Sequence, residues 1–420
     1  MYEFPLYTPT SLLTQSRSNM TLLTRFIFTL SVLSLVGCSS LQRKAAVPSQ
    51  QMGQAQIAGL SSARYMVASQ PSIDQMATDI QAGFKVRDEK TLNAPANYLS
   101  LSGGGDDGAY GAGLLIGWAE RGDRPQFNLV TGISTGALIA PFAYMGKEYD
   151  PVLRDVYTKY GPKDIFIERG LISGILSDGL SDTTPLFQLI SKYIDQDFLK
   201  KVANEYTTKN RWLLIGTTNL DAGVPVVWNM GKIASIGTPE ALELFRKVML
   251  ASASIPGAFS PVMFDFEVSG QSFQEMHVDG GAITQVFLYP SALSQKGKEL
   301  NVKLQKERNA YIIRNARLDP EWRETERGTL SIIQRAISSM IQTQGIGDLY
   351  RIYHTTQLDG VRFNLAFIGP DFKFPHKAEF DTAYMQALFD YGYKQGLGGK
   401  EWQKYPPGYK RGFDQELPKK

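Results

Sequence analysis

The chain has 420 residues, of which 43% are hydrophobic and 20% charged, so it is long enough for one large globular domain or two smaller ones. Its 44 basic and 41 acidic residues give a formal net charge of +3 without long like-charged runs, which argues against a nucleic-acid-binding protein. The single cysteine, Cys38, excludes an intramolecular disulfide.

The first residues have the pattern of an export signal. Arg25 precedes an apolar run at 26–36, and Gly37 and Cys38 follow, in the order of a basic region, a hydrophobic region and a cleavage site. The run is too short for a settled transmembrane helix. Leu35-Val36-Gly37-Cys38 resembles the lipobox of bacterial lipoproteins, which implies that residues 1–37 are a signal peptide and that Cys38 becomes lipidated.

This resemblance carries two further expectations. The residues before Met20 are unlike the start of a signal peptide, so translation beginning at Met20 is an alternative. Ser39 stands where an aspartate would favour retention at the inner membrane, so we expect a lipid-anchored protein of the bacterial cell envelope, at the outer membrane. An ordinary signal peptide with an incidental cysteine is the competing interpretation.

The rest of the chain divides by composition into three parts. Residues 38–95 are polar, with helical periodicity at 66–84, and are interpreted as a lipidated N-terminus and tether excluded from the catalytic fold. Residues 96–400 are predicted to form the catalytic domain. Residues 401–420 are predicted to be a polar C-terminal tail.

Strand and helix patterns alternate through the predicted domain. Alternation of this kind, without an internal repeat, predicts an α/β domain with a largely parallel sheet. Strands are expected at 98–101, 127–131, 212–218, 224–228, 310–313 and 363–368, and helices at 108–119, 135–144, 241–251, 330–343 and 382–391.

A glycine-rich loop follows the first of these strands and leads into a helix. Such a loop lets backbone N–H groups surround an anion, either a phosphate or an oxyanion. A dinucleotide-binding fingerprint is the alternative, but two aspartates lie beside the expected pyrophosphate, and no strand ends in an acidic residue about 20 positions on. The motif glycines are Gly103, Gly104, Gly105 and Gly108.

The second motif is Gly-x-Ser-x-Gly, formed by Gly132, Ser134 and Gly136 between an apolar strand and a helix. This is the context of a nucleophile elbow, in which small neighbours let the serine hydroxyl project from a sharp turn. The motif alone is weak, since a serine at such a turn also serves merely as a helix cap.

The third motif is Asp279-Gly280-Gly281, which follows an alternating stretch at 273–278. A carboxylate at a strand end is a candidate general base for the serine. Taken singly, Asp-Gly more often marks a turn.

Together, in this order and spacing, the three motifs resemble the patatin-like phospholipase family over residues 97–284. The segment 251–261 is similar to the one that patatins carry ahead of their aspartate. The resemblance implies a three-layer α/β/α fold and a Ser-Asp dyad. Ser134 would be the nucleophile, Asp279 the general base, and the N–H groups of Gly103, Gly104 and Gly105 the oxyanion hole. The family usually has a basic residue where Asp107 stands here.

The resemblance also implies the substrate, a phospholipid or lysophospholipid, reached from a membrane to which Cys38 is anchored. The aromatic-rich stretch 165–199 would cover an acyl pocket, contact lipid, or simply pack in the core. No cofactor or metal is expected, because no His/Cys cluster has ligand spacing. The sequence leaves the oligomeric state open.

Two competing functions remain. An α/β-hydrolase with a Ser-His-Asp triad would use His354 or His376, both of which follow Ser134 in the chain. A non-catalytic lipoprotein that binds lipid or scaffolds an envelope complex belongs to a different class.

Overall fold

A computed structural model describes residues 41–57, 60, 63–84, 94–169, 177–299, 307–320, 322, 324–399 and 401–409. The chain divides into one unit at 1–44 and a second at 45–420. Cys38 and the rest of the predicted signal peptide lie outside the described residues. The fold therefore concerns the second unit.

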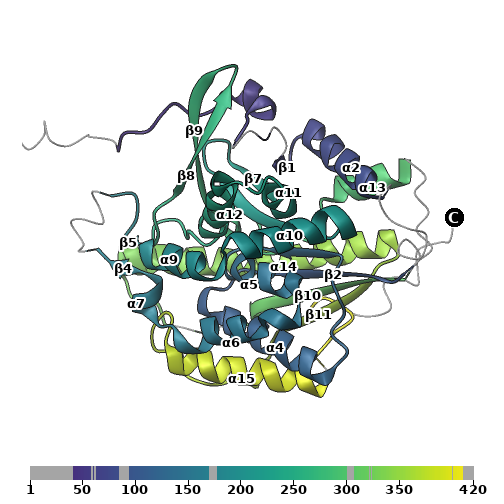
Figure 1. Cartoon of the computed structure of the whole chain (residues 1–420). Helices are drawn as coiled ribbons and strands as arrows, with labels where there is room; N and C mark the ends of the chain where they lie inside the picture. The colour runs from purple at the N-terminus through teal and green to yellow at the C-terminus, as the bar shows by residue number, and fades with distance from the viewer. Residues whose placement is uncertain are drawn as a thin grey trace, which may run out of the picture. The chain divides into compact units, whose positions relative to one another are not determined.

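A nine-stranded sheet forms the centre of this unit (Figure 1). Its middle is parallel, and the order of strands there is β6 (Trp212–Asn219), β3 (Leu129–Gly132), β2 (Ala96–Leu101), β10 (Arg308–Arg317) and β11 (Arg362–Ile368). The remaining strands are antiparallel: β7 (Val224–Asn229) pairs with β6, β1 (Arg64–Met66) with β7, β9 (Gln271–Asp279) with the end of β6, and β8 (Val262–Val268) with β9. The prediction of an α/β fold with a largely parallel sheet is confirmed.

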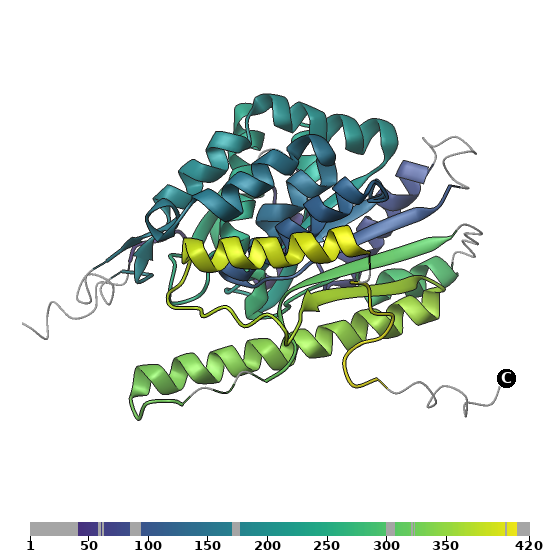
Figure 2. The same cartoon turned by 90° about the horizontal axis from the view of Figure 1, so that it is seen from below.

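Helices cover both faces of the sheet, which gives the three layers seen in Figure 2. One face carries the inner helices α4 (Gly108–Arg121), α5 (Thr135–Met145), α11 (Met230–Ala234) and α12 (Pro239–Ser252). Outside them lie α6 (Asp150–Lys159), α7 (Pro162–Ile165), α9 (Thr184–Tyr193), α10 (Gln196–Lys209) and α15 (Thr382–Gly398). The opposite face carries α2 (Gln70–Phe84), α13 (Ser291–Glu299) and α14 (Thr329–Asp359). A small hairpin of β4 (Ile167–Glu168) and β5 (Ser181–Asp182) stands apart from the main sheet.

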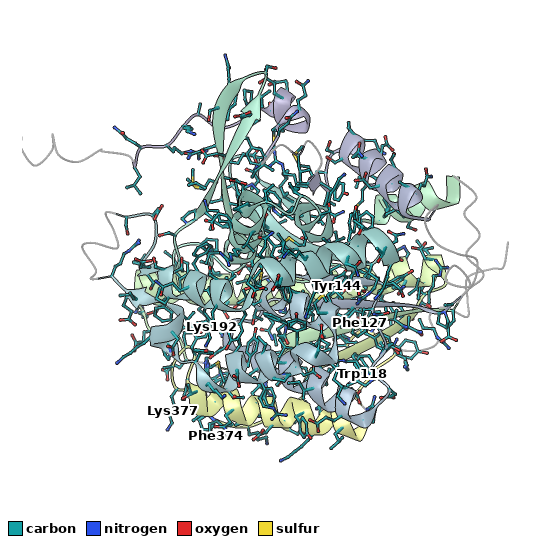
Figure 3. All side chains as sticks on the ribbon, viewed as in Figure 1. Trp118, Phe127, Tyr144, Lys192, Phe374 and Lys377 are labelled. Atoms are coloured by element: carbon teal, nitrogen blue, oxygen red, sulfur yellow. The ribbon has the colours of Figure 1, made fainter. Side chains whose placement is uncertain are left out.

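The central strands are largely apolar, because helices bury both of their sides. All eight residues of β6 are buried. Leu213 and Ile215 pack into the main core on one face, while Trp212 and Leu214 pack toward α2 on the other. Near the same core, Trp118 of α4 contacts Phe127 with ring centroids 5.9 Å apart (Figure 3).

Helices α4 and α15 pack backbone against backbone. A Cβ on Gly113 would lie 2.1 Å from the Phe389 carbonyl oxygen, and one on Gly392 would lie 2.3 Å from that of Tyr110. Only glycine permits this approach, which fixes α15 beside the start of α4. The segment that leads into α15 is thereby brought to the glycine-rich loop.

The prediction of a tether at 38–95 is wrong for much of that range. Strand β1 extends the main sheet, and Tyr65, Ile73 and Met76 are fully buried. Arg64 forms an ion pair with Glu275 of β9, and both side chains are nearly inaccessible to solvent. The composition of this segment is polar because only a few periodic positions of α2 face the core, so composition alone did not indicate that the segment belongs to the fold.

The C-terminal prediction also changes. Gln403 exchanges backbone hydrogen bonds with Leu365 of β11, and Trp402 packs against Trp118 and Tyr311, so residues 401–409 belong to the fold rather than to a tail. Helix α14 is longer than the predicted 330–343 and reaches Asp359. In the described part of the chain no helix, α14 included, is long and apolar enough to cross a bilayer.

Candidate active site

Ser134 lies at the sharp turn between β3 and α5. Its backbone angles are φ 56° and ψ −127°, a strained conformation that a residue with a side chain rarely adopts. The flanking glycines explain how the turn is accommodated: a Cβ on Gly132 would lie 2.4 Å from the Gly136 carbonyl oxygen, and one on Gly136 would lie 2.3 Å from that of Leu101. The turn has the geometry expected of a nucleophile elbow.

Asp279 is the last residue of β9. Its backbone N–H donates to the Ser254 carbonyl oxygen over 2.9 Å, and its Oδ1 accepts from the backbone N–H of Gly281 over 2.7 Å. Burial raises the pKa of Asp279 to about 7, against the opposing effects of hydrogen bonds from Ser134 and Gly281. This carboxyl group therefore titrates near neutral pH.

Strand register brings the two residues to the same end of the sheet. Gly132 of β3 pairs with Ile215 of β6, and Thr217, two residues further along β6, pairs with Asp279. Ser134 is likewise two residues beyond Gly132. The predicted nucleophile and base therefore flank β6 at one level, although 145 positions separate them in the sequence.

The glycine-rich loop lies directly against the serine. A Cβ on Gly103 would be 3.1 Å from the Cβ of Ser134. The Gly103 N–H donates to the Gln285 carbonyl oxygen over 3.1 Å, so it is not free to bind an oxyanion. Among the described residues, the N–H groups of Gly104 and Gly105 have no acceptor, which reduces the predicted set of three donors to these two.

Ser252, at the end of α12, supports the nucleophile turn, and the sequence did not single it out. Its Oγ accepts from the Ser134 N–H over 3.0 Å and donates to the Gly216 carbonyl oxygen over 2.7 Å. Ser254, two residues on, holds Asp279 through its backbone carbonyl oxygen. The segment that resembles patatins ahead of the aspartate thus contacts both predicted dyad residues.

Residues of β10 hold the glycine loop, and these too were missed. Arg314 Nη1 donates to the Gly103 carbonyl oxygen over 3.3 Å and to Gln285 Oε1 over 3.4 Å. Asn315 donates its backbone N–H to Ser102 Oγ and its Nδ2 to the Ser102 carbonyl oxygen. Burial lowers the pKa of Arg314 to about 10, so the guanidinium remains charged at neutral pH. Gln285 Nε2 also donates to the Gly281 carbonyl oxygen, which links the two glycine motifs.

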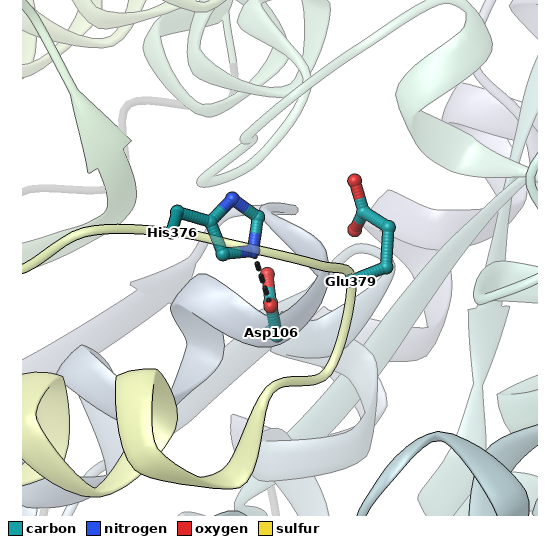
Figure 4. A group of neighbouring side chains, drawn as sticks. All are labelled: Asp106, His376 and Glu379. Carbon is teal, nitrogen blue, oxygen red and sulfur yellow. Dashed lines mark hydrogen bonds and ion pairs between the residues drawn. The ribbon is translucent and has the colours of Figure 1, made fainter.

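The two aspartates of the loop bind the segment that precedes and begins α15. Asp106 Oδ2 accepts from His376 Nε2 and from the Phe380 N–H, both over 2.8 Å (Figure 4). Asp107 Oδ1 accepts from the Tyr384 hydroxyl over 2.6 Å. Burial raises the pKa of Asp107 to about 7. Both acids therefore serve as internal contacts, where the sequence left the role of Asp107 in doubt.

Asp106, His376 and Glu379 could also hold a metal ion, because their ligand atoms lie within 4.8 Å of one another. The hydrogen bond to Asp106, however, raises the pKa of His376 to about 9. An imidazolium has no lone pair to offer a cation. At neutral pH the cluster is an ion pair between His376 and Asp106, with Glu379 exposed beside it.

The other two histidines are placed differently. His277 is fully buried, with Nδ1 bonded to Thr217 Oγ1 and Nε2 to Glu275 Oε2, so both ring nitrogens are occupied. Its pKa is lowered by burial. His354 is exposed on α14. His376 contacts the glycine loop through Asp106.

An apolar cavity opens at Ser134. Its volume is about 570 Å³, counting the open space at its mouth. Ile165, Leu186 and Leu189, from the stretch predicted to pack or to cover an acyl pocket, lie in its wall, whereas Phe198 is in the core. The remaining wall is formed mainly by Gly105, Leu138, Val156, Tyr157, Ile255, Phe259, Phe380 and Met385.

Comparisons with known proteins gave a family match and a structural neighbour. Residues 99–289 match the family model described as patatin-like phospholipase. Among solved structures, the chain is similar to the crystal structure of VipD from Legionella pneumophila, with 12% identity, a TM-score of 0.33, and coverage of 73% of this chain and 67% of that chain. No curated protein matches the sequence. By the family match, residues 99–289 form a domain of the patatin-like phospholipase family.

Proposed function

We propose that the protein is a lipid acyl hydrolase in which Ser134 is the nucleophile and Asp279 the general base. The match to patatin-like phospholipases supports the enzyme class. The observation that carries the assignment of residues is the strained turn at Ser134, which opens on an apolar cavity and adjoins both a buried carboxyl group and the glycine loop.

In the proposed reaction, Ser134 Oγ attacks the ester carbonyl carbon while the Asp279 carboxylate takes the hydroxyl proton. The oxyanion that forms accepts hydrogen bonds from the N–H groups of Gly104 and Gly105. Asp279 returns the proton to the departing alcohol. Water then hydrolyses the acyl-enzyme, with Asp279 again acting as base.

The cavity favours an acyl chain as the group transferred. Its wall is almost wholly apolar, so it would bind a hydrocarbon chain by removing it from water. A phospholipid or lysophospholipid supplies such a chain beside an ester bond. Mass spectrometry of the products from mixed phospholipids would identify the acyl position that is cleaved and the preferred headgroup.

A Ser-His-Asp mechanism is the weaker proposal. His376, with a pKa of about 9, is protonated at neutral pH and cannot accept a proton there, whereas Asp279 has a pKa of about 7. His277 has both nitrogens bonded elsewhere. Loss of esterase activity on replacing His354 or His376 with alanine, with the fold retained, would favour the triad.

Active-site labelling tests the enzyme class itself. The full chain should react covalently with a fluorophosphonate, and Ser134→Ala should abolish the labelling while Asp279→Asn slows it strongly. Ser254→Ala, which leaves the backbone contact to Asp279 in place, is the control and should label normally. Absence of labelling in the wild-type protein would favour the non-catalytic lipoprotein.

We further propose that Cys38 is lipidated and anchors the protein to the bacterial outer membrane. The support is the pattern of a basic residue, an apolar run and Leu35-Val36-Gly37-Cys38. Metabolic labelling with a radioactive fatty acid should mark the wild-type protein and not Cys38→Ser. Density-gradient fractionation of the envelope would then distinguish the outer from the inner membrane.

A further inference from the structure

The N-terminal half of α14 exposes a stripe of large apolar side chains. Ile332, Ile333, Ile337 and Met340 are 55%, 48%, 48% and 69% exposed. Positions 333, 337 and 340 recur at the spacing of one helix face. Helix faces in contact only with water normally carry charged or polar residues, so this stripe requires an explanation.

The same half of the helix is almost without charge. Within residues 329–344 the only charged residue is Arg335, and the polar positions are serine, threonine and glutamine. An amphipathic helix can lie at the boundary between lipid headgroups and acyl chains, and this one, with a single Arg, would be held there mainly by its buried apolar area. It does not suit a partner recognised by complementary charge.

Trp322 is a further large exposed side chain, in the segment before α14. It is 85% exposed and lies in the connection from β10 to α14. The connection runs beside the helix, because Gln342 Nε2 donates to the Asp319 carbonyl oxygen over 2.8 Å. Tryptophan favours the membrane–water interface.

Helix α14 passes directly behind the candidate active site. Gly345 lies against the Arg314 guanidinium so closely that a Cβ there would be 2.7 Å from Nη2, and Arg314 in turn donates to the Gly103 carbonyl oxygen. Toward its N-terminus the helix extends past the carboxyl ends of β10 and β11 (Figure 2). At about 1.5 Å per residue, the stripe from Met340 back to Ile332 lies ~8 to ~20 Å along the helix from the contact at Gly345.

Exposed apolar residues also occur on segments that lead to the cavity. Ile167 is 57% exposed and follows Ile165, which lines the cavity; Phe374 is 44% exposed and precedes the lining residue Phe380. Phe374 lies at the lower left of Figure 3, beside Lys377. The same end of the sheet therefore carries the cavity, these residues and the stripe on α14.

We propose that the N-terminal half of α14, together with Trp322, inserts into the surface of a lipid bilayer and holds the candidate active site against it. The inference rests on the proposed function, since a lipid acyl hydrolase meets its substrate in a bilayer. Because the inserted face is apolar and nearly uncharged, binding should depend on loose lipid packing and hardly on anionic lipid or salt.

Flotation with neutral phosphatidylcholine vesicles tests this. The chain from residue 38 onward, carrying Cys38→Ser so that neither the signal peptide nor acylation can contribute, should bind small, highly curved vesicles better than large ones, with little change between low and high salt. Ile333→Ser combined with Ile337→Ser should weaken partitioning by about tenfold or more, as expected for two lost isoleucine contacts. Leu358→Ser is the matched control, because it removes a 57% exposed leucine from the far end of the same helix.

Tryptophan emission gives an independent measurement. Trp118, Trp212 and Trp228 are buried, and the half-buried Trp402 packs on Trp118 and Tyr311, so a blue shift on adding vesicles would come mainly from Trp322 and should disappear in Trp322→Phe. Equal vesicle binding by the double variant and the wild-type protein would overturn the proposal. So would a double variant that turns a dimer into a monomer by light scattering without changing vesicle binding, since the stripe would then be a contact between copies.

Activity separates this proposal from the proposed function. The double variant should hydrolyse a soluble short-chain ester like the wild-type protein, and lose hydrolysis of vesicle lipid in proportion to its lost binding. A wild-type protein that binds vesicles through α14 but never hydrolyses either substrate would sink the proposed function and leave the membrane contact intact. If the double variant hydrolyses vesicle lipid as fast as the wild-type protein, the membrane contact is refuted and the proposed function stands.

Discussion

The backbone N–H of Ser134 donates to the Oγ of Ser252, 118 positions further along the chain. The same hydroxyl donates to the Gly216 carbonyl oxygen of β6. The strained turn is therefore tied to the central strand by a side chain that contacts neither the cavity nor, in our proposal, the substrate. Ser252 is a positioning residue for Ser134.

Ser252→Ala should lower both kcat and the stability of the fold. The variant leaves the buried Ser134 N–H without an acceptor, which costs about 1–3 kcal/mol and relaxes the turn. We expect kcat for a soluble ester to fall by roughly ten- to a hundredfold with KM little changed, if positioning contributes as in other enzymes. Steady-state kinetics and thermal unfolding measure the two effects.

Ser254→Ala is the matched control for this change. The Ser254 hydroxyl donates to the Leu250 carbonyl oxygen in the last turn of α12, and its contact with Asp279 is through the backbone. Its kcat should stay close to that of the wild-type protein. An equal loss in both variants would mean that the end of α12 acts merely through its stability.

The pH dependence of kcat/KM should report Asp279. Because burial raises the pKa of this carboxyl group to about 7 and the base must be ionised to accept a proton, activity should rise with pH through about 7. Asp107 also has a pKa of about 7 and lies in the glycine loop. Asp107→Asn can still accept from Tyr384, so it should keep the rising limb; a limb that vanishes in this variant would assign it to Asp107.

The local parts of the site were predictable from sequence. Gly132 and Gly136 flank Ser134, and a side chain at either position would meet neighbouring backbone. Because both glycines lie within two residues of the serine, the requirement is visible in the sequence as a fixed spacing. The parallel strands were equally recognisable, since strands buried on both sides read as continuous apolar runs. Asp279, in contrast, could be identified as the candidate base only from the order of the three motifs.

The supporting residues could not be found in this way. Ser252, Gln285 and Arg314 act mainly through contacts with residues 29 to 211 positions away, and none stands in a distinctive local pattern. Strand β1 is a further case, because its role depends on pairing with β7, which lies far along the chain. Polar composition predicted a tether there. The three residues of β1 nevertheless extend the sheet, and one face of α2 packs beside them.

Arg64→Ala tests whether the N-terminal segment is integral to the fold. The change leaves Glu275 buried without its ionic partner, for which we expect a loss of about 3–5 kcal/mol in the free energy of unfolding. Arg154→Ala breaks the exposed pair with Glu120 and should cost less than about 1 kcal/mol. Denaturant titration measures the free energy of unfolding of both variants. A similar small loss in Arg64→Ala and Arg154→Ala would favour the tether interpretation.

Adjacent glycines of the loop should respond very differently to alanine. Gly104 has φ +159° and no room for a Cβ, which would lie 1.8 Å from the Asn315 carbonyl oxygen, so Gly104→Ala should lose more than about 3 kcal/mol of stability. Gly105 has φ +58° with open space around it, so Gly105→Ala should cost about 1–2 kcal/mol from backbone strain alone. Equal melting temperatures for the two variants would contradict this loop conformation.

The ion pair between His376 and Asp106 should make stability depend on pH in a defined window. The hydrogen bond to Asp106 raises the pKa of His376 from 6.5 to about 9. A raised histidine pKa means that the contribution is complete below about pH 6.5 and is lost as pH rises through about 9. Because the pair is partly exposed, the contribution should be about 1 kcal/mol or less.

The measurement is the difference in melting temperature between the wild-type protein and His376→Gln at several pH values. This difference should favour the wild-type protein at pH near 6 and shrink at pH above about 9. Titration of Asp107 and Asp279 occurs in both proteins and largely cancels in the difference. His354→Gln, at an exposed position of α14, is the control for the loss of a histidine elsewhere in the chain. A difference for His376→Gln that is constant over this range would show that the Asp106 contact holds the segment before α15 by geometry alone, without charge.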